Sequence, residues 1–178
     1  MSGNDNQKVI LVDESDREMG LEDKLAAHRN GAKLHRALSV MVFNGGGETL
    51  LQQRAMGKYH TQGRWSNTCC SHPYPGESPE HAAHRRLKEE MGFDCELNEA
   101  FVFTYRADVG NGLTEHEYDH VFFGTYDEEP KPDLEEAMAY RWESLENLQK
   151  ELKENPGRFT PWLGAMVEKA IAARSAGS

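Results

Sequence analysis

The feature that most constrains the fold is a sharply delimited helix in the middle of the chain, "SPEHAAHRRLKEEMG" at residues 78–92. Ser78 can accept a hydrogen bond from the first turn, and Pro79 suits the first helical position. Gly92 follows the last turn, where a residue in the left-handed region commonly ends a helix. Any fold for this chain must therefore bury one face of a helix that starts and stops at defined residues.

The apolar stripe of this helix consists of Ala83, Leu87 and Met91. At about 100° per residue, Glu90 falls on the edge of the stripe, next to Arg86. A carboxylate beside a core-facing stripe is uncommon. Glu90 is therefore a candidate functional residue.

Strand patterns lie on both sides of the helix. Segments 36–43 and 48–53 precede it and are joined by "NGGGE", whose glycines can supply the positive φ angles of a hairpin turn. Strands are expected after it at 99–106, 116–126 and 139–142, followed by helices at "SLENLQKELKEN" and "TPWLGAMVEKAIAAR", the last capped by Thr160. This order predicts an α+β fold, a mixed β-sheet sandwich flanked by helices, rather than a doubly wound parallel sheet.

The length of 178 residues permits one well-filled core, so we expect a single domain over 1–178 with frayed polar tails at 1–7 and 174–178. The longest nearly apolar run, "ALSVMVF", is too short to cross a bilayer, and "MSGNDNQ" lacks the order of a signal peptide. Three cysteines, two of them adjacent, do not form a disulfide framework. We expect a cytoplasmic protein with no membrane partner, either a monomer or a weak dimer.

The formal net charge of −10 disfavours nucleic acid as a partner, because binding to phosphates needs a basic face. A phosphorylated ligand would need a local basic pocket. Six basic side chains could build one: Lys24, Lys33, Arg54, Lys58, Arg85 and Arg86. Solvated ion pairs on the helix surface are the better explanation for Arg85 and Lys88.

Histidines and glutamates form a second set of candidates. In a strand, Glu115 and Glu117 of "TEHEYDH" point to the same face and could share a ligand. With His28, His35 and His72 they make a six-coordinate site with one free position, suited to manganese, zinc or iron better than to magnesium. The alternative is that eight histidines produce some pairs by chance and that "EHEYDHV" is a solvated strand edge. The alternative is stronger for any single histidine, and the joint set favours a metal site.

The stretch "RWSNTCCSHPYPGES" at 64–78 raises a separate question about its two cysteines. It contains no C-x-x-C redox pair, and no second cysteine cluster exists to complete a structural zinc site. One cysteine could be a reactive thiol and the other a buried filler. The residues alone leave open which is which.

Residues 71–93 resemble the Nudix signature, G-x5-E-x7-R-E-U-x-E-E-x-G-U, in which U is an aliphatic or similar apolar residue. Its spacing is kept from Ser71 through Glu77 to Phe93. Serine replaces the opening glycine, and Arg86 stands where the hydrolases carry a metal-binding glutamate. The second change removes a carboxylate that gathers metal for hydrolysis and offers a phosphate contact instead.

The motifs "WSNTCCSHP", "YRA" at 105–107 and "EHE" at 115–117, with "KLAAHRNGAKLHRALSVMVFN" and "FTPWLGAM", are similar to those of the type I isopentenyl diphosphate isomerases. The similarity covers roughly residues 8 to 170. It implies isomerisation of isopentenyl diphosphate to dimethylallyl diphosphate, an isoprenoid precursor, on a Nudix-like fold.

The resemblance also implies roles for individual residues. Cys70, Glu117 and Tyr105 would be catalytic, and Cys69 dispensable. Mn²⁺ or Zn²⁺ would bind the same His28, His35, His72, Glu115 and Glu117 set. Mg²⁺ would arrive with the diphosphate and bind Glu90 and the backbone carbonyl of Cys70. The substrate contacts would be Lys24, Arg54, Lys58, Ser71, Arg86 and Trp162.

The implied chemistry protonates an alkene on one carbon and deprotonates another, with Cys70 and Glu117 on opposite faces of the substrate. The order of the two transfers stays open, although the family favours protonation by the glutamate and tyrosine. Two other functions remain: a Nudix hydrolase of a nucleotide or prenyl diphosphate, and a metal-binding module without catalysis.

Overall fold

The computed structural model describes residues 7–29 and 31–177. Its strands are β1 (Lys8–Val12), β2 (Glu18–Asp23), β3 (His35–Phe43), β4 (Thr49–Arg54), β5 (Trp65–Ser66), β6 (Cys69–Ser71), β7 (Leu97–Gly110), β8 (Leu113–Thr125) and β9 (Ala137–Glu143). Its helices are α1 (Lys24–Ala27), α2 (Pro79–Met91), α3 (Leu145–Glu154) and α4 (Leu163–Ala176), with a 3₁₀ turn at Pro156–Arg158.

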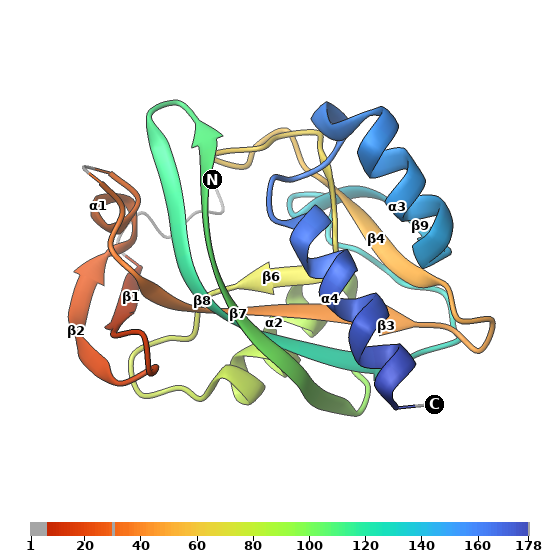
Figure 1. The fold of residues 1–178 in the computed structure, drawn as a ribbon, viewed down its shortest axis with the longest axis horizontal. Coiled ribbons are helices and arrows are strands. Elements are labelled where there is room, and N and C mark those ends of the chain that lie inside the picture. The colour runs from red at the N-terminus through yellow and green to blue at the C-terminus, as the bar shows by residue number, and fades with distance from the viewer. Residues whose placement is uncertain (1–6, 30, 178) are drawn as a thin grey trace.

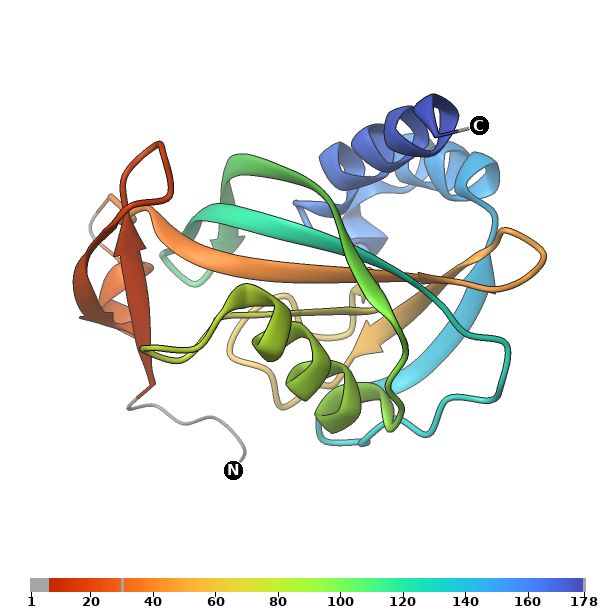
Figure 2. The ribbon, with the colours of Figure 1, turned by 90° about the horizontal axis from the view of Figure 1, so that it is seen from below.

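The sheet is organised around β3, whose apolar sequence is buried along nearly its whole length. A continuous apolar run of this kind indicates a strand covered on both faces. Helix α2 lies on one side of the sheet, and α3 and α4 lie on the other (Figure 2). The result is the α+β sandwich that the order of elements predicts.

Strand β3 runs parallel to β8 from His35↔Glu117 to Phe43↔Thr125 and antiparallel to the short β6. Strand β8 also forms a long hairpin with β7, so β8 lies between β3 and β7 (Figure 1). This mixed pairing brings three distant segments together at the start of β3. The candidate site lies there.

The expected hairpin between 36–43 and 48–53 is only partly correct. Asn44 and Gly47 do form the turn, with Gly47 at a φ of 82°. However, β3 and β4 share a single pairing, Phe43↔Thr49, because the two strands then diverge. Strand β4 pairs instead along its length with β9.

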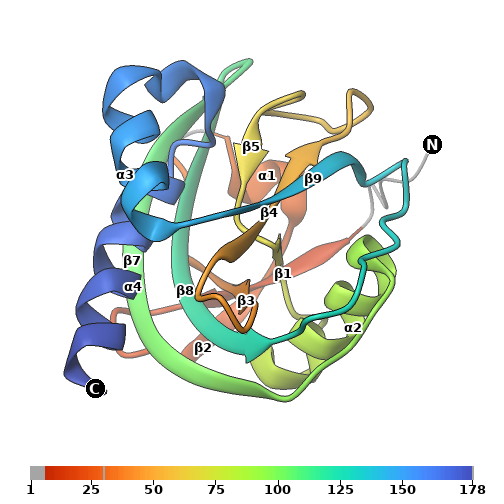
Figure 3. The same ribbon diagram turned by 90° about the vertical axis from the view of Figure 1, so that its right-hand side faces the viewer.

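The two faces of the sheet carry separate cores. Between α2 and the sheet, Leu87 and Met91 pack with Leu38 and Phe122. The opposite face packs against α3 and α4, which lie side by side in Figure 3. The expected stripe of α2 is confirmed, because Ala83, Leu87 and Met91 are fully buried.

The caps of α2 are also confirmed, whereas the start of α4 is not. Ser78 accepts a hydrogen bond from the His81 backbone N–H, and Gly92 adopts the left-handed conformation. Helix α4 begins at Leu163, after a turn at Pro161 and Trp162, rather than directly after Thr160. The Thr160 side chain instead lies 3.0 Å from the Ser66 hydroxyl in a buried pair, so it serves the tertiary structure.

Helix α4 continues through Ala176, so most of the tail expected at 174–178 is helical. Residues 1–6 and 178, which belong to the expected tails, lie outside the described residues. The β1–β2 hairpin and the short β5 and β6 were not anticipated. Within residues 7–29 and 31–177, no helix is both long and apolar enough to cross a membrane.

Gly92 provides a stability prediction. Its φ is 75°, and a Cβ added there would collide with the Lys131 backbone carbonyl. We expect Gly92→Ala to lower the free energy of unfolding by about 2 to 3 kcal/mol, measured by urea denaturation. Gly76→Ala is the control, because Gly76 has a φ of 80° with nothing within 4 Å of its added Cβ. Equal losses in the two variants would show that the collision costs nothing.

Candidate functional site

The alternation of β8 places Glu115 and Glu117 on its buried face, at 4% and 6% exposure. Strand β7 pairs Tyr105 opposite Glu117. The Tyr105 hydroxyl donates to Glu115 Oε2 at 2.5 Å and also to Glu117. The segment is therefore not a solvated strand edge, and the two carboxylates share one hydroxyl donor.

The three predicted histidines meet these carboxylates from different segments. His28 follows α1, His35 begins β3 and His72 follows β6. Their Nε2 atoms face inward, as these distances show: His72 Nε2 to Glu117 Oε1 2.8 Å, His35 Nε2 to Glu117 Oε1 3.6 Å, His35 Nε2 to His72 Nε2 3.2 Å and His28 Nε2 to Glu115 Oε1 3.8 Å. The structure thus brings all five predicted metal-site residues together.

The outer nitrogens of two rings are anchored to the backbone. His28 Nδ1 lies 2.5 Å from the Lys24 carbonyl, and His35 Nδ1 lies 2.8 Å from the Lys33 carbonyl. Because a carbonyl only accepts, each Nδ1 carries a proton, and in the neutral form of each ring Nε2 presents a lone pair inward. His28 Nε2 is buried without a hydrogen-bond partner among the described residues. This donor set fits a divalent cation, and we call these five residues the His–Glu cluster.

The charge of the cluster also suits a cation. Burial alone would raise the pKa of Glu115. Its contacts with His28 and His60 have the larger and opposite effect, so the pKa lies well below the usual value. The pKa of Glu117 is lowered in the same way by His35 and His72. Burial lowers the pKa of His72 to about 4. The cluster therefore combines anionic carboxylates with a neutral ring that can act as a ligand.

A cavity of about 60 Å³ opens beside the cluster. Four basic side chains line the cavity: Lys24, Arg54, Lys58 and Arg86. Ser71, Glu90 and Trp162 also line it. Burial, followed by the charge of Lys58, lowers the pKa of Lys24 to about 8. Four converging cations in a partly enclosed space favour a bound polyanion.

The other basic candidates lie elsewhere. Lys33 pairs with Glu22 at the surface. Arg85 binds Glu77 at 2.7 Å, and Lys88 lies 3.1 Å from Asp94. Lys88 thus forms a surface ion pair as expected, whereas the prediction holds only in part for Arg85, whose shortest contact is with Glu77, before the helix, and whose pair with Glu89 on the helix is longer at 3.4 Å.

Glu90 is buried on the cavity side of α2, at 3% exposure. It accepts from Arg86 Nη2 at 2.6 Å and from Gln52 Nε2 at 2.7 Å. Burial raises its pKa, but Arg86 and Lys58 more than offset this, so the pKa is lowered. Glu136, which was not anticipated, pairs with Lys58 and lies 3.3 Å from Arg86.

The adjacent cysteines point to opposite faces of β6, as successive residues of a strand must. Cys69 is fully buried in the core beneath α2. Cys70 is half-buried and lines the cavity with Ser71. Burial raises the pKa of the Cys70 thiol, an effect that Arg54 opposes.

Trp162 forms an aromatic wall of the cavity. Its Nε1–H donates to Asn67 Oδ1 at 3.2 Å, and its ring centroid lies 6.3 Å from that of Tyr105. The Arg54 guanidinium lies 5.8 Å from the same ring. The Trp162 ring thus neighbours both Arg54 of the cationic lining and Tyr105, whose hydroxyl donates to the two glutamates.

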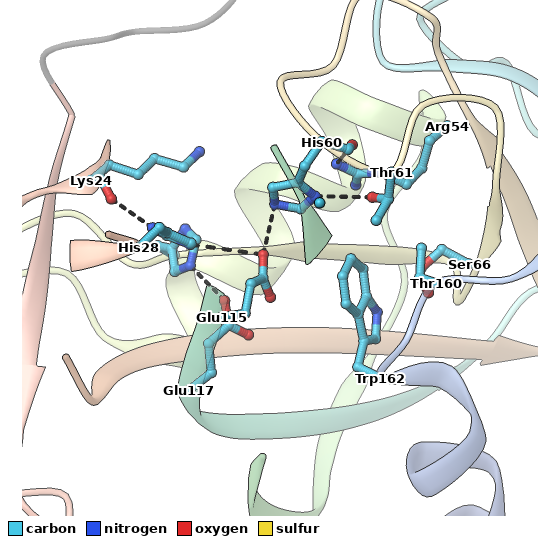
Figure 4. Close-up of polar contacts among 12 residues, drawn as sticks. Lys24, His28, Arg54, His60, Thr61, Ser66, Glu115, Glu117, Thr160 and Trp162 are labelled. Atoms are coloured by element: carbon cyan, nitrogen blue, oxygen red, sulfur yellow. Dashed lines mark hydrogen bonds and ion pairs between the residues drawn. The ribbon is translucent and has the colours of Figure 1, made fainter. Parts of the chain in front are cut away.

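His60 is a site residue that the sequence analysis missed. It lies on the loop between β4 and β5, with Nε2 2.8 Å from Glu115 Oε1 (Figure 4). Its position two residues after Lys58 in "GKYHTQ" was the only signal available. Neither strand alternation nor a helix places it, because a loop has no side-chain period.

The comparisons with known proteins concern the family and the fold. The NUDIX domain model matches residues 33–163. "Isopentenyl-diphosphate Delta-isomerase 2" of Aromatoleum aromaticum is 51% identical over 168 residues, which cover 94% of this chain and 88% of that protein. The isopentenyl-diphosphate Delta-isomerase of Pectobacterium atrosepticum is 48% identical over 155 residues, covering 87% and 86%.

Among solved structures, DR0079 from Deinococcus radiodurans superposes with a TM-score of 0.77 at 16% identity, covering 92% of this chain and 98% of that one. At this identity the likeness concerns the fold alone. The predicted Nudix-like α+β fold is thereby confirmed.

Proposed function

The chain belongs to the isopentenyl-diphosphate Delta-isomerases of the NUDIX family, and from this we propose that it interconverts isopentenyl diphosphate and dimethylallyl diphosphate. One observation carries the proposal. A single cavity joins four cationic side chains at its lining to Cys70, Tyr105 and Glu117. The first group can hold the diphosphate, and the second can exchange protons with the five-carbon chain.

We assign the His–Glu cluster to Mn²⁺ or Zn²⁺, because imidazole nitrogens together with carboxylates suit these ions. Mg²⁺ would accompany the diphosphate, held by Glu90 and the backbone carbonyl of Cys70. When bound, the ions neutralise phosphate charge and help set the acidity of Glu117. The diphosphate contacts are Lys24, Arg54, Lys58, Ser71 and Arg86.

The proton transfers belong to side chains of the chain itself. The terminal alkene carbon of isopentenyl diphosphate gains a proton, the methylene bonded to the other alkene carbon loses one, and the double bond moves by one carbon. Cys70 and Glu117 would serve opposite faces of the substrate. Tyr105, whose hydroxyl donates to Glu117, holds the carboxylate and can relay its proton.

Trp162 contributes to the intermediate stage. Its aromatic face can stabilise positive charge that develops on the substrate, by about 2 kcal/mol in a desolvated site. The wall it forms also keeps water away from that charge.

The proposed isomerase activity makes an isoprenoid precursor. We place the protein in the cytoplasm as a monomer or weak dimer.

The experiment is incubation of the metal-loaded protein with isopentenyl diphosphate, monitoring dimethylallyl diphosphate and free phosphate together. We expect isomerisation without phosphate release. Release of phosphate without isomerisation would support the Nudix hydrolase alternative. Arg86, which replaces a carboxylate of the hydrolase signature, argues against that alternative.

Arg86 provides a quantitative prediction for binding. We expect Arg86→Gln to raise KM for isopentenyl diphosphate about 10- to 100-fold, because a charge-assisted contact contributes about 1.5–3 kcal/mol. The control is Arg85→Gln, because the neighbouring arginine pairs with Glu77 outside the cavity. An unchanged KM in both variants would contradict the proposed contact between Arg86 and the diphosphate.

A further inference from the structure

His60 lies inside the site but outside the His–Glu cluster. Its side chain is buried at 2% exposure, and Nε2 lies 2.8 Å from Glu115 Oε1. Although this contact is close, it is not aligned as a hydrogen bond, and Nε2 has no other hydrogen-bond partner among the described residues. A buried imidazole nitrogen that faces a carboxylate can be either a metal ligand or a donor.

The second ring nitrogen distinguishes these two possibilities. In His28 and His35, Nδ1 faces a backbone carbonyl, which fixes the proton on Nδ1. In His60, Nδ1 lies 2.9 Å from the Thr61 hydroxyl, which has no other hydrogen-bond partner in the described part of the chain. Because a buried hydroxyl hydrogen needs an acceptor, Thr61 donates to Nδ1. Nε2 of His60 then carries a proton and lies 2.8 Å from Glu115 Oε1, a close polar contact that a small rotation of the carboxylate would align as a hydrogen bond.

The loop around His60 is shaped to hold this ring. Thr61 has a φ of 50°, an uncommon conformation for a β-branched residue that surrounding contacts must maintain. The His60 carbonyl accepts from Arg54 Nη2 at 3.3 Å, and the ring stands edge-on to Trp162 with centroids 6.1 Å apart. Figure 4 shows His60 between Glu115 and the Arg54 and Thr61 side of the site.

We propose that His60 is a positioning residue, whose Nε2–H holds the Glu115 carboxylate in the orientation that binds the divalent cation. It also ties this carboxylate to the loop that carries Lys58. The inference rests on the proposed function, because it takes Glu115 as a ligand in the His–Glu cluster. Groups that orient metal ligands typically contribute about 10- to 100-fold to metal affinity.

The test compares His60→Phe with His60→Gln in the full-length protein stripped of metal. Zn²⁺ affinity is measured by calorimetry, and Co²⁺ absorption reports the ligand set. We expect His60→Phe to weaken Zn²⁺ binding about 10-fold. His60→Gln, which keeps an N–H donor, should retain most of the affinity, and the Co²⁺ spectrum should be the same in all forms. His81→Gln, an exposed histidine on α2, is the control.

Full Zn²⁺ affinity in His60→Phe would overturn the inference. Equal losses in both variants with an altered Co²⁺ spectrum would also overturn it, because His60 would then be a ligand. If His60→Phe does not fold, Thr61→Val tests the same tautomer and should weaken binding without a spectral change. Failure of the unsubstituted protein to bind Zn²⁺ or Co²⁺ would contradict the proposed metal site itself.

Discussion

Cys70→Ala is expected to lower kcat for isopentenyl diphosphate about 10²- to 10⁴-fold, the range for a general acid or base. The Cys70 side chain lines the cavity on the opposite strand face from Cys69. The substitution removes the sulfur and keeps the backbone carbonyl proposed for Mg²⁺. KM and metal content should therefore change little, and initial-rate kinetics would separate kcat from KM.

Cys69→Ala is the matched control. Cys69 is fully buried in the core beneath α2, and burial raises the pKa of its thiol well above the usual value. We expect normal kcat and a loss of about 1 kcal/mol in the free energy of unfolding. The assignment would be reversed if Cys69→Ala lost activity and Cys70→Ala kept it. Full activity in Cys70→Ala would favour the non-catalytic metal-binding module.

Glu117→Gln is expected to abolish both activity and tight metal binding in the His–Glu cluster. Glu117 Oε1 lies 2.8 Å from His72 Nε2 and 3.6 Å from His35 Nε2, and Tyr105 donates to its other oxygen. One neutral amide would therefore remove a ligand charge and a proton carrier together. We expect at least about a 10³-fold fall in kcat, with metal content measured by atomic emission on the same sample.

Asp119→Asn is the control for this substitution. Asp119 lies two residues further along the same buried face of β8 and accepts from the Ser39 hydroxyl at 2.8 Å. Burial, together with the charge of Glu117, raises the pKa of Asp119 well above its usual value. Because burial and the charge of Glu117 favour the protonated form of Asp119, an amide in its place changes the local charge less than Glu117→Gln does. If Glu117→Gln kept its metal and turned over normally, Glu117 would have neither proposed role.

Local chemistry made much of the fold predictable. Ser78 and Gly92 mark the ends of α2 because each satisfies a terminal backbone group, and both act within one turn. The predicted start of α4 was wrong because a contact between distant residues decided it. Thr160 has the side chain of a cap, but its hydroxyl is engaged by Ser66 from a distant strand. A tertiary contact of this kind leaves no local signal.

The sheet shows the same division. Alternation along β8 predicted that Glu115 and Glu117 share a face. Alternation could not predict that β3 pairs in parallel with β8, because partner choice depends on long-range packing. The expected hairpin therefore contains a single pair of bridged residues, Phe43 and Thr49, and β4 pairs along its length with β9 instead.

The site divides in a similar way. The histidines and glutamates were found because metal ligands have a recognisable chemistry, and the family resemblance added Cys70 and Tyr105. Glu136 was missed because it comes to Lys58 and Arg86 from a segment far along the chain. His60 was missed because only the folded loop turns its ring toward Glu115.

Incubation of the metal-loaded protein with isopentenyl diphosphate in deuterated water tests the proposed isomerisation. A proton donor that exchanges with solvent should leave deuterium in the newly formed methyl group of dimethylallyl diphosphate, detected by NMR and mass spectrometry. We expect deuterated product with the diphosphate intact. A folded, metal-loaded protein that forms no dimethylallyl diphosphate and exchanges no hydrogen would contradict the isomerase function.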